Sequence, residues 1–388
     1  MKQRIAAALL LLLILFSGRI LSFAQGEAPQ GDEPYAGLPL CAPDVYLVDP
    51  GDCLALGPAK VMTDMARKGI TIPPRPLPAA PLDPEMMQLS LRDGKLNVDN
   101  WEPVGVFPSV EAAVEGSSPG WRIPPGVTRY ISFKNITYVN NNPYLQLESG
   151  EWVRASPADF SPFTGLVFRA TPKLNFGWII EDTQPRNAPD YGAQVLDKRY
   201  TRETLVTIYD TQLVNDVEWS MIGFNEWVER RYLRKVVINT TPPEGVDNQR
   251  WIEVNLYEQT LSVYDEGQLK FATLITTGAK PYYTQPGLFK VYQKLPYETM
   301  QGAFAADKSD FYYLMDVPWT MYFDKARALH GAYWRTLFGY PASHGCVNLS
   351  VSDARWLYEW AKEGDWVYVW DVSGETPTDP EFYGDGGA

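Results

Sequence analysis

The sequence is poor in the side chains that carry most protein chemistry, with three cysteines and two histidines in 388 residues. It also contains no block of lysine and arginine, and its formal net charge is -13. Nucleic-acid-binding proteins normally present a basic face, so that class of function is disfavoured. Beyond residue 24 no apolar run approaches the ~20 residues that a membrane-spanning helix needs, and no span is expected there.

The composition that remains is typical of folded, turn-rich domains. Hydrophobic residues make up 45% and charged residues 21%, which is enough apolar surface for a sizeable core. The aromatic fraction of 13%, with 30 Gly and 32 Pro, favours strands and turns over helical bundles. We therefore expect a mostly β fold, and the length suggests roughly two to three domains.

The first residues have the pattern of an export signal. Lys2 and Arg4 precede the apolar run Ile5–Phe16, and Ser22-Phe23-Ala24 offers a small-x-small cleavage site. Residues 1–24 are therefore predicted to be a signal peptide, and the protein is predicted to be secreted or held in the cell envelope. An uncleaved N-terminal anchor is the alternative, although the run is too short for ~30 Å of hydrocarbon and Arg19 interrupts any extension.

Residues 25–96 are predicted to be a linker. Six prolines fall between Pro73 and Pro84, which favours an extended polyproline-like spacer. Cys41 and Cys53 could close a small loop here, worth up to ~3 kcal/mol, or remain two unpaired thiols. Cys346 is then the odd cysteine, and in an exported protein it is either a partner for another chain or a reactive thiol.

Residues 97–245 show short β-type runs broken by turn residues, which predict one or two small β modules. Tyr144-x-x-Leu147-x4-Trp152-Val153 recurs as Trp219-x-x-Ile222-x4-Trp227-Val228 at an offset of 75 residues. The pattern resembles strands of the bacterial Src-homology-three-like barrels found beside cell-wall enzymes. Two unrelated strands that each bury a tryptophan would explain it equally well.

The next domain is predicted over 249–371. It begins with a β meander and has one main helix over Ala354–Lys362, for which Ser350-x-x-Asp353 offers the N-cap. Trp366–Trp370 forms a closing strand, and residues 372–388 are a tail rich in Gly, Pro and acidic residues that is expected to be flexible.

Both histidines lie within sixteen residues of Cys346. A cysteine thiol, with a pKa of ~8.5, is mostly protonated at neutral pH, and a neighbouring imidazole can take its proton. Gly345 keeps the backbone beside the sulfur free of a Cβ, so that amides there can point at a developing oxyanion. Asn348 can fix an imidazole or the loop.

Three other interpretations compete for these residues. His330, His344 and Cys346 could ligate zinc, but they supply at most three ligands and lack the usual spacings. Cys346 could be a buried core thiol, although His, Gly and Asn are poor core neighbours. A disulfide to another chain would leave the histidines unexplained.

Ser343-His344-Gly345-Cys346-Val347-Asn348, preceded by His330-Gly331, resembles the motif of the YkuD-type L,D-transpeptidases, which cross-link the bacterial cell wall. The resemblance covers about 249–371 and includes Gln259, Thr277-Gly278 and Val317-Pro318-Trp319. It implies a C-terminal β-sandwich with one main helix. This sequence departs from the family at Thr284-Gln285-Pro286-Gly287, where Thr-Pro-x-Gly is usual, and in a slightly shorter spacing from His330 to Ser343.

The resemblance also implies roles for individual residues. Cys346 would be the nucleophile and His330 the general base, with the Gly331 carbonyl orienting its imidazole. His344 and Asn348 would shape the loop, and the amides of Gly345 and Cys346 would form the oxyanion hole. Ser343 and Tyr313 are expected to contact the substrate, Tyr313 as a further oxyanion donor. Trp334 is expected there because the aromatic residues between His330 and Cys346 suggest an aromatic-walled cleft, although they could equally be core residues that pack under a lid. No cofactor or metal is needed.

The family reaction is a two-step acyl transfer. The nucleophile attacks the amide after the third residue of a tetrapeptide stem and forms a thioester, and the side-chain amine of another stem resolves it into a 3→3 cross-link. The implied partners are peptidoglycan stem peptides, with wall contact through the middle β modules and a role in cell-wall biogenesis and cell shape. Hydrolysis by water, attachment of a protein to the wall, and a non-catalytic wall-binding role remain alternatives.

Overall fold

The computed structural model describes residues 65–71, 75–96, 99–305 and 307–384. The predicted signal peptide, Cys41 and Cys53 lie outside the described residues. The chain divides into two compact units, Met1–Thr71 and Ile72–Ala388, and within the first only a short helical stretch that begins at Met65 is described. Of the helices in the described part of the chain, none has both the length and the apolar character needed to cross a membrane.

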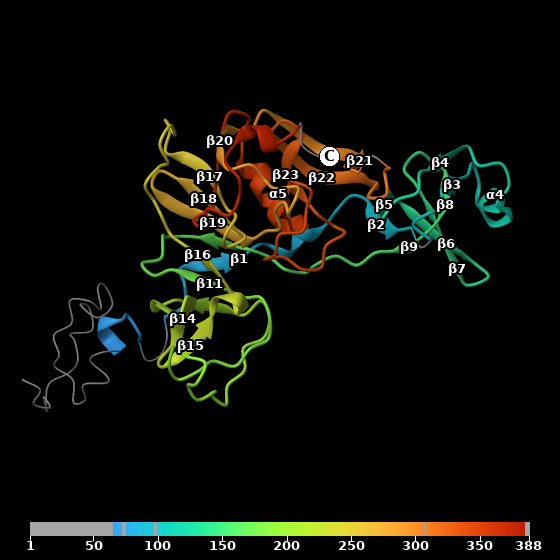
Figure 1. The fold of residues 1–388 in the computed structure, drawn as a ribbon. Helices are drawn as coiled ribbons and strands as arrows, with labels where there is room; N and C mark the ends of the chain where they lie inside the picture. The colour runs from blue at the N-terminus through green and yellow to red at the C-terminus, as the bar shows by residue number, and fades with distance from the viewer. Residues whose placement is uncertain (1–64, 72–74, 97–98, 306, 385–388) are drawn as a thin grey trace, which may run out of the picture. The chain divides into compact units, whose positions relative to one another are not determined.

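The fold is mostly β, as predicted (Figure 1). The first part of the second unit alternates short strands with one helix and a 3-10 turn. Its elements are β1 (Ala79–Pro81), η2 (Pro84–Met87), β2 (Arg92–Lys95), β3 (Val104–Val106), α4 (Val110–Glu115), β4 (Trp121–Ile123), β5 (Thr128–Phe133), β6 (Asn135–Val139), β7 (Asn142–Gln146), β8 (Trp152–Arg154), β9 (Ser156–Pro157) and β10 (Leu166–Phe168).

A second group of short sheets follows. Its elements are β11 (Phe176–Ile179), β12 (Leu205–Thr207), β13 (Asp210–Val214), β14 (Val217–Gly223), β15 (Glu226–Glu229), η3 (Arg230–Tyr232) and β16 (Leu233–Val236). The C-terminal elements are β17 (Arg250–Asn255), β18 (Thr260–Asp265), β19 (Gln268–Leu274), β20 (Gly287–Lys290), β21 (Gln293–Gly302), β22 (Tyr312–Asp324), β23 (Arg327–Gly331), β24 (Val347–Leu349), α5 (Val351–Trp360), β25 (Trp366–Trp370) and η4 (Pro380–Phe382).

The sequence pattern that recurs at an offset of 75 residues corresponds to a repeated three-stranded meander. In β6–β7–β8 Gln146 pairs with Trp152, and in β13–β14–β15 Met221 pairs with Trp227, each partner displaced by 75 positions. The first hairpins match as well, since Val139 pairs with Asn142 and Val214 pairs with Val217. Both hairpins turn through two residues of positive φ, Asn140-Asn141 and Asn215-Asp216, which are residue types that tolerate this conformation. The echo is therefore one supersecondary unit used twice.

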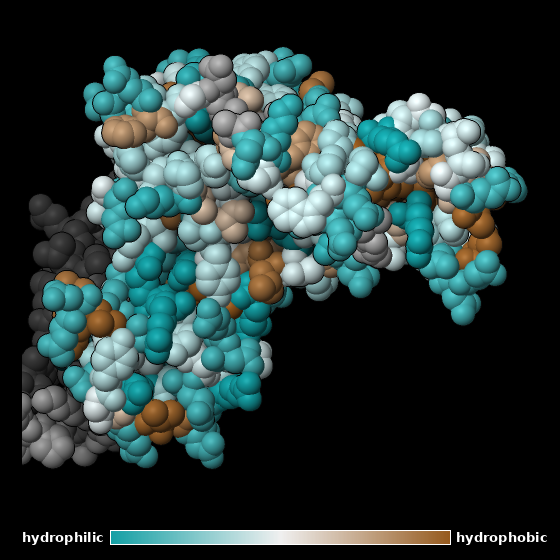
Figure 2. Space-filling model, turned by 45° about the vertical axis from the view of Figure 1, so that its right-hand side comes forward, coloured by the Kyte–Doolittle hydropathy of each residue, from teal (hydrophilic) through white to brown (hydrophobic). Residues whose placement is uncertain are grey.

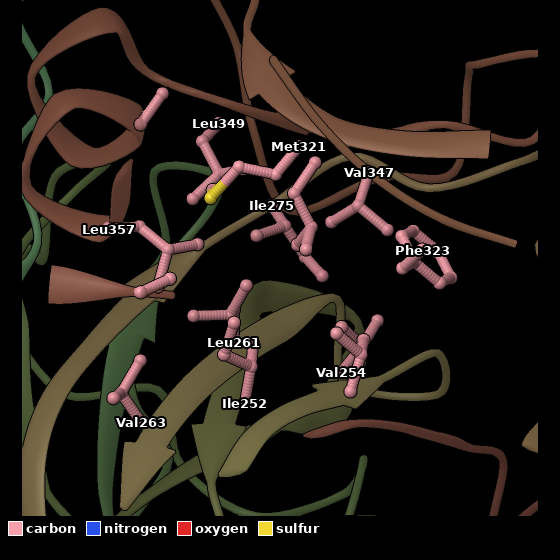
Figure 3. Packing of buried hydrophobic residues seen from close by; sticks show 14 of the residues in the cluster. Ile252, Val254, Leu261, Val263, Ile275, Met321, Phe323, Val347, Leu349 and Leu357 are labelled. Carbon is pink, nitrogen blue, oxygen red and sulfur yellow. The ribbon is translucent and has the colours of Figure 1, made fainter. Parts of the chain in front are cut away.

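The C-terminal domain packs two seven-stranded sheets and helix α5 around one core (Figures 1 and 3). One sheet has the order β1-β10-β19-β18-β17-β25-β20, and the other has β24-β23-β22-β5-β2-β9 with β21 paired to β22. Buried side chains from both sheets and the helix meet between them, as sheet packing requires. The core residues labelled in Figure 3 are Ile252, Val254, Leu261, Val263, Ile275, Met321, Phe323, Val347, Leu349 and Leu357.

Upstream strands complete both sheets, which the linker interpretation did not anticipate. β1, inside the proline-rich stretch, pairs with β10, and β10 pairs with β19. β5 pairs in parallel with β22, and β2 and β9 extend the sheet beyond it. Asp353 of α5 accepts from the Gly165 amide at 2.7 Å and from the Thr273 hydroxyl at 2.5 Å, which fixes the β10 segment on the helix. Residue 249 is therefore not a structural boundary.

The described part of the C-terminal tail also differs from expectation, because it packs on the domain. Tyr383 is buried, and the Arg327 guanidinium lies 5.2 Å from the centroid of its ring. The Lys325 ammonium donates to the carbonyl oxygens of Tyr383 and Gly384 at 3.2 and 3.1 Å. Residues up to 384 are thus held against the start of β23.

Hydrophilic and intermediate residues predominate on the face shown in Figure 2, where hydrophobic residues form separate groups. The most exposed large hydrophobic side chains, Trp101, Leu213 and Phe382, belong to three distant parts of the sequence. Scattered exposure of this kind is normal for a folded domain.

Two carboxyl groups near each other on β2 and β22, those of Asp93 and Asp316, predict that the stability of the fold depends on pH. Asp93 is buried beside Asp316, and both burial and that second carboxylate raise the pKa of Asp93 to about 8. Its carboxyl is therefore protonated in the folded protein, and the unfolded chain, whose carboxyl has a pKa near 3.8, loses that proton first as the pH rises. We expect stability to fall between about pH 4 and 8 for this reason.

Asp93→Asn removes that penalty. We expect it to raise the melting temperature at pH 8 by at least a few °C relative to wild type, and to have little effect at pH 4, since ~1 kcal/mol moves the midpoint by about 2–4 °C in a domain of this size. Scanning calorimetry at both pH values measures this, with the exposed Asp159→Asn as control. An equal change at both pH values would contradict the expectation.

Candidate functional site

Two parallel strands place Cys346 and His330 on the same face. In the pairing of β23 with β24, Leu329 lies opposite Val347, and His330 lies opposite Asn348. Leu329 and Val347 point into the core, so the alternation of a strand turns His330, Asn348 and the preceding Cys346 to the other face. His330 and Cys346, sixteen positions apart in the sequence, thus lie on neighbouring strands and on the same face of the sheet, because Cys346 is two residues before Asn348, the pairing partner of His330.

That face opens on a cavity of about 480 Å³. The residues from the predicted site that line it are His330, Trp334, Ser343, His344, Cys346 and Asn348. A second part of the wall comes from the upstream strands and includes Lys95, Thr128 and Tyr130. The family motif and the segment that precedes it by about 200 residues therefore build one cavity.

The imidazole of His330 is oriented by the main chain. It is 2% exposed, and its Nδ1 lies 3.2 Å from the carbonyl oxygen of Gly331. Because a carbonyl only accepts, Nδ1 carries the proton, and Nε2 is left as the basic nitrogen. Burial lowers the pKa of His330 to about 4, so the ring is neutral at physiological pH. The Trp334 ring lies 5.5 Å from it and forms one side of its pocket.

The thiol of Cys346 is also neutral at rest. The residue is 5% exposed, and its Sγ lies 3.9 Å from the carbonyl oxygen of Ala326. Burial raises the pKa of the thiol to about 11, against smaller opposing effects of a backbone hydrogen bond at Ala328 and the charge of Arg327. Since both groups are neutral at rest, a nucleophilic attack by this thiol would require its proton to be transferred during the attack.

The Ser343 hydroxyl forms hydrogen bonds within the loop of residues 343–346. It donates to the Cys346 carbonyl oxygen at 2.6 Å and accepts from the Gly345 amide at 3.2 Å. Gly345 has φ +122, a conformation that side chains rarely adopt. Its amide is directed to Ser343, so the structure does not provide it as the oxyanion donor expected from the resemblance. For the Cys346 amide the oxyanion role stays a prediction.

The departure at Thr284 leaves the loop anchored. The Thr284 hydroxyl donates to the Gly345 carbonyl oxygen at 2.8 Å and accepts from the Gly278 amide at 2.9 Å. Gln259 binds both the hydroxyl and the amide of Thr277, whose carbonyl oxygen accepts from the Ser343 amide at 3.0 Å. These contacts connect the end of β19 to the motif loop.

His344 and Asn348 form parts of the cavity wall. The His344 ring stacks on Phe304, with centroids 4.6 Å apart, and burial lowers the pKa of its imidazole. The main chain of Asn348 is paired with Thr276, and the Oδ1 of its side chain is buried with no hydrogen-bond partner among the described residues. That oxygen is available to an N–H group of a bound molecule.

Tyr313 does not reach the cavity. Its side chain is buried in the core of the first β module, with Ile131 and Leu145 among its neighbours. Tyr312, one position earlier, faces the opposite way, lines the cavity and packs in the same cluster as Cys346. Its hydroxyl is buried with no partner among the described residues. The sequence shows that Tyr312 and Tyr313 point to opposite faces of one strand, but it does not show which of these faces meets the cavity.

Within the described residues, no three His, Cys, Asp or Glu side chains come together in a way that could hold a metal ion. The polar groups at the cavity near Cys346 include the neutral imidazole of His330 and the buried hydroxyl of Tyr312.

The model of the L,D-transpeptidase catalytic domain (YkuD) matches residues 249–369, which confirms the resemblance for this part of the chain. A comparison with curated proteins finds no match.

Solved structures with similarity include an L,D-transpeptidase from Stackebrandtia nassauensis, at 30% identity over 35% of this chain and 60% of that one, with a TM-score of 0.27. The catalytic domain of the E. faecium enzyme is 27% identical over 32% of this chain and all of that one, with a TM-score of 0.29. The L,D-transpeptidase from Mycobacterium smegmatis is 16% identical over 55% of this chain and 94% of that one, with a TM-score of 0.30. This chain thus spans 60% of the length of the Stackebrandtia protein.

The neutral resting pair predicts a steep pH dependence for the thiol. With the Cys346 pKa near 11, the thiolate fraction grows about tenfold per pH unit below that value. We expect alkylation of Cys346 by iodoacetamide to accelerate by about this factor between pH 7 and 8 and again to pH 9. Intact mass measures it, with Cys346→Ser to subtract reaction at other cysteines. A rate that is already constant from pH 6 would reveal an ion pair instead.

Proposed function

We propose that this protein is an exported peptidoglycan L,D-transpeptidase that forms 3→3 cross-links through a thioester at Cys346. The observation that carries the proposal is the common cavity of Cys346 and His330, inside a segment that matches the L,D-transpeptidase catalytic domain. A thiol and an oriented neutral base on one face are the minimal parts of a cysteine acyltransferase.

In the first step, Sγ of Cys346 attacks the carbonyl carbon of the third residue of a tetrapeptide stem. Nε2 of His330 takes the thiol proton as the S–C bond forms. The amide C–N bond then breaks, and the imidazolium returns the proton to the departing amine of the terminal D-alanine. Because Nδ1 stays bound to the Gly331 carbonyl, the ring keeps its orientation through the transfer.

The negative charge of the tetrahedral intermediate needs donors that are already in place. The Tyr312 hydroxyl supports this role, since it is buried, has no partner among the described residues and packs in the cluster that contains Cys346. With the Cys346 amide it would form a two-donor oxyanion hole. The Gly345 amide stabilises the loop through Ser343 instead.

In the second step, a side-chain amine of another stem attacks the thioester carbonyl carbon while Nε2 of His330 takes a proton from that amine. The C–S bond then breaks, and the imidazolium returns the proton to Sγ, so that Cys346 leaves as the thiol. The buried surroundings of the sulfur limit access of water, which supports transfer to an amine over hydrolysis. Export follows from the sequence pattern of residues 1–24, and the repeated β meanders would hold the domain on the wall of the cell envelope.

The proposal is tested by mass spectrometry with a carbapenem and with stem peptides. Wild-type protein should gain one carbapenem adduct that Cys346→Ala does not form. With tetrapeptide stems it should release D-alanine and yield dimers, whereas trimmed tripeptides alone would indicate a carboxypeptidase and a peptide-linked protein would indicate wall attachment. Binding to purified sacculi without turnover, and with no adduct, would overturn the enzyme assignment.

The two adjacent tyrosines offer a matched pair of variants. Tyr312→Phe removes the hydroxyl that faces Cys346, and we expect acylation to slow by about 10²-fold, the usual effect of losing one oxyanion donor. Tyr313→Phe removes a hydroxyl on the opposite face and should change the rate by less than about threefold. Stopped-flow acylation measures both. Equal effects would show that neither hydroxyl stabilises the oxyanion.

A further inference from the structure

The charge of the cavity is opposite to that of the chain. The protein carries 47 acidic and 34 basic residues, yet the 480 Å³ cavity is lined by Lys95 and Arg335 and by no aspartate or glutamate. Asp310 does not line the cavity, although its charge raises the pKa of His344; its carboxylate accepts from the amides of Phe304 and Ala305. The charged side chains that a molecule meets in the cavity wall are therefore both basic.

Arg335 is the main source of this positive charge. Its side chain is half-buried: the guanidinium donates to the Ala342 carbonyl oxygen at the exposed end, and its Nε is buried with no hydrogen-bond partner among the described residues. Among the described residues no carboxylate pairs with it. Burial lowers its pKa to about 10, so it stays charged at neutral pH, and its charge lowers the pKa of both His330 and His344. A charge whose Nε is withdrawn from water is normally paired, and among the described residues Arg335 has no carboxylate as counter-ion.

From this cavity we infer that Arg335 binds a carboxylate of the acyl donor, supplied by the substrate when it occupies the site. The inference rests on the proposed function and deepens it by naming the chemistry of the donor. A guanidinium can bind a carboxylate through two parallel hydrogen bonds, and the Ala342 carbonyl uses only one of its donors. Lys95, which is exposed at the upstream wall, adds long-range attraction only.

The acyl carbon belongs to the third residue of the donor stem and must lie at Cys346. The side chain of that same residue therefore falls in the cavity that Arg335 lines. A diamino-diacid at the third position carries a carboxylate at the end of this side chain. We assign Arg335 to that group, so the donor preferred by this cavity has a free, and not an amidated, side carboxylate.

The first test uses two small alkylating reagents of the same size. Iodoacetate is anionic and iodoacetamide is neutral, and in both the Sγ–C bond forms as the C–I bond breaks and iodide leaves. The ratio of their rates cancels the effect of the Cys346 pKa, because both react with the thiolate. We expect Arg335→Gln to lower the iodoacetate-to-iodoacetamide ratio by about tenfold.

Two variants control for charge alone. Arg169→Gln removes the same charge at an exposed position outside the cavity, and should leave the ratio within about twofold. Lys95→Gln should lower it by less than about threefold because the ammonium is exposed and screened. An unchanged ratio in Arg335→Gln, or an equal fall in either control, overturns the assignment.

The second test needs only the wild-type protein. Two tetrapeptide donors differ in whether the side carboxylate of the third residue is free or amidated. We expect kcat/KM for acylation to be about tenfold higher for the free form, with most of the difference in KM. Equal values overturn the inference while the proposed function stands. If neither donor acylates Cys346, the proposed function fails, and the alkylation ratio still decides whether Arg335 recognises an anion.

Discussion

The parallel pairing of β23 with β24 is the constraint on which the candidate site depends. It fixes His330 opposite Asn348 and thereby sets the thiol one step away on the same face. The core side of both strands is held by Leu329, Val347 and their neighbours, so neither strand can slip by one residue without turning apolar side chains outward. The hydrophobic core, and not a contact between their side chains, thus determines the positions of Cys346 and His330.

Burial then determines the chemistry that this geometry allows. The same low-dielectric surroundings raise the pKa of Cys346 and lower that of His330, so charge separation is costly until a substrate arrives. A neutral pair protects the thiol from oxidation and from small electrophiles, since the thiolate is the reactive form. Under the proposed mechanism the transition state then needs donors in place, and the Tyr312 hydroxyl, buried without a partner among the described residues, would be one of them.

Much of this site could be predicted from the sequence because the relevant residues are rare and close together. Of the motif and the upstream histidine, Ser343, His344, Cys346, Asn348 and His330 line one cavity. The 75-residue echo also held, down to the register of the paired strands. Tyr313 was misplaced because a strand pattern gives the alternation of side chains but not which face meets a loop folded from elsewhere. The short strands β1 and β2 were missed because their pairing partners are remote and their own periodicity is slight.

Those remote strands change what the catalytic segment is. Residues 249–369 match a domain model by themselves, but here their two sheets continue into strands contributed from residue 79 onward. The same pairing of β5 with β22 that closes the sheet carries Thr128 and Tyr130 to the cavity wall, and β2 brings Lys95. Side chains outside the family segment therefore shape the space beside Cys346. Selectivity for a substrate can then change in the upstream strands without altering the thiol, the imidazole or the core that holds them.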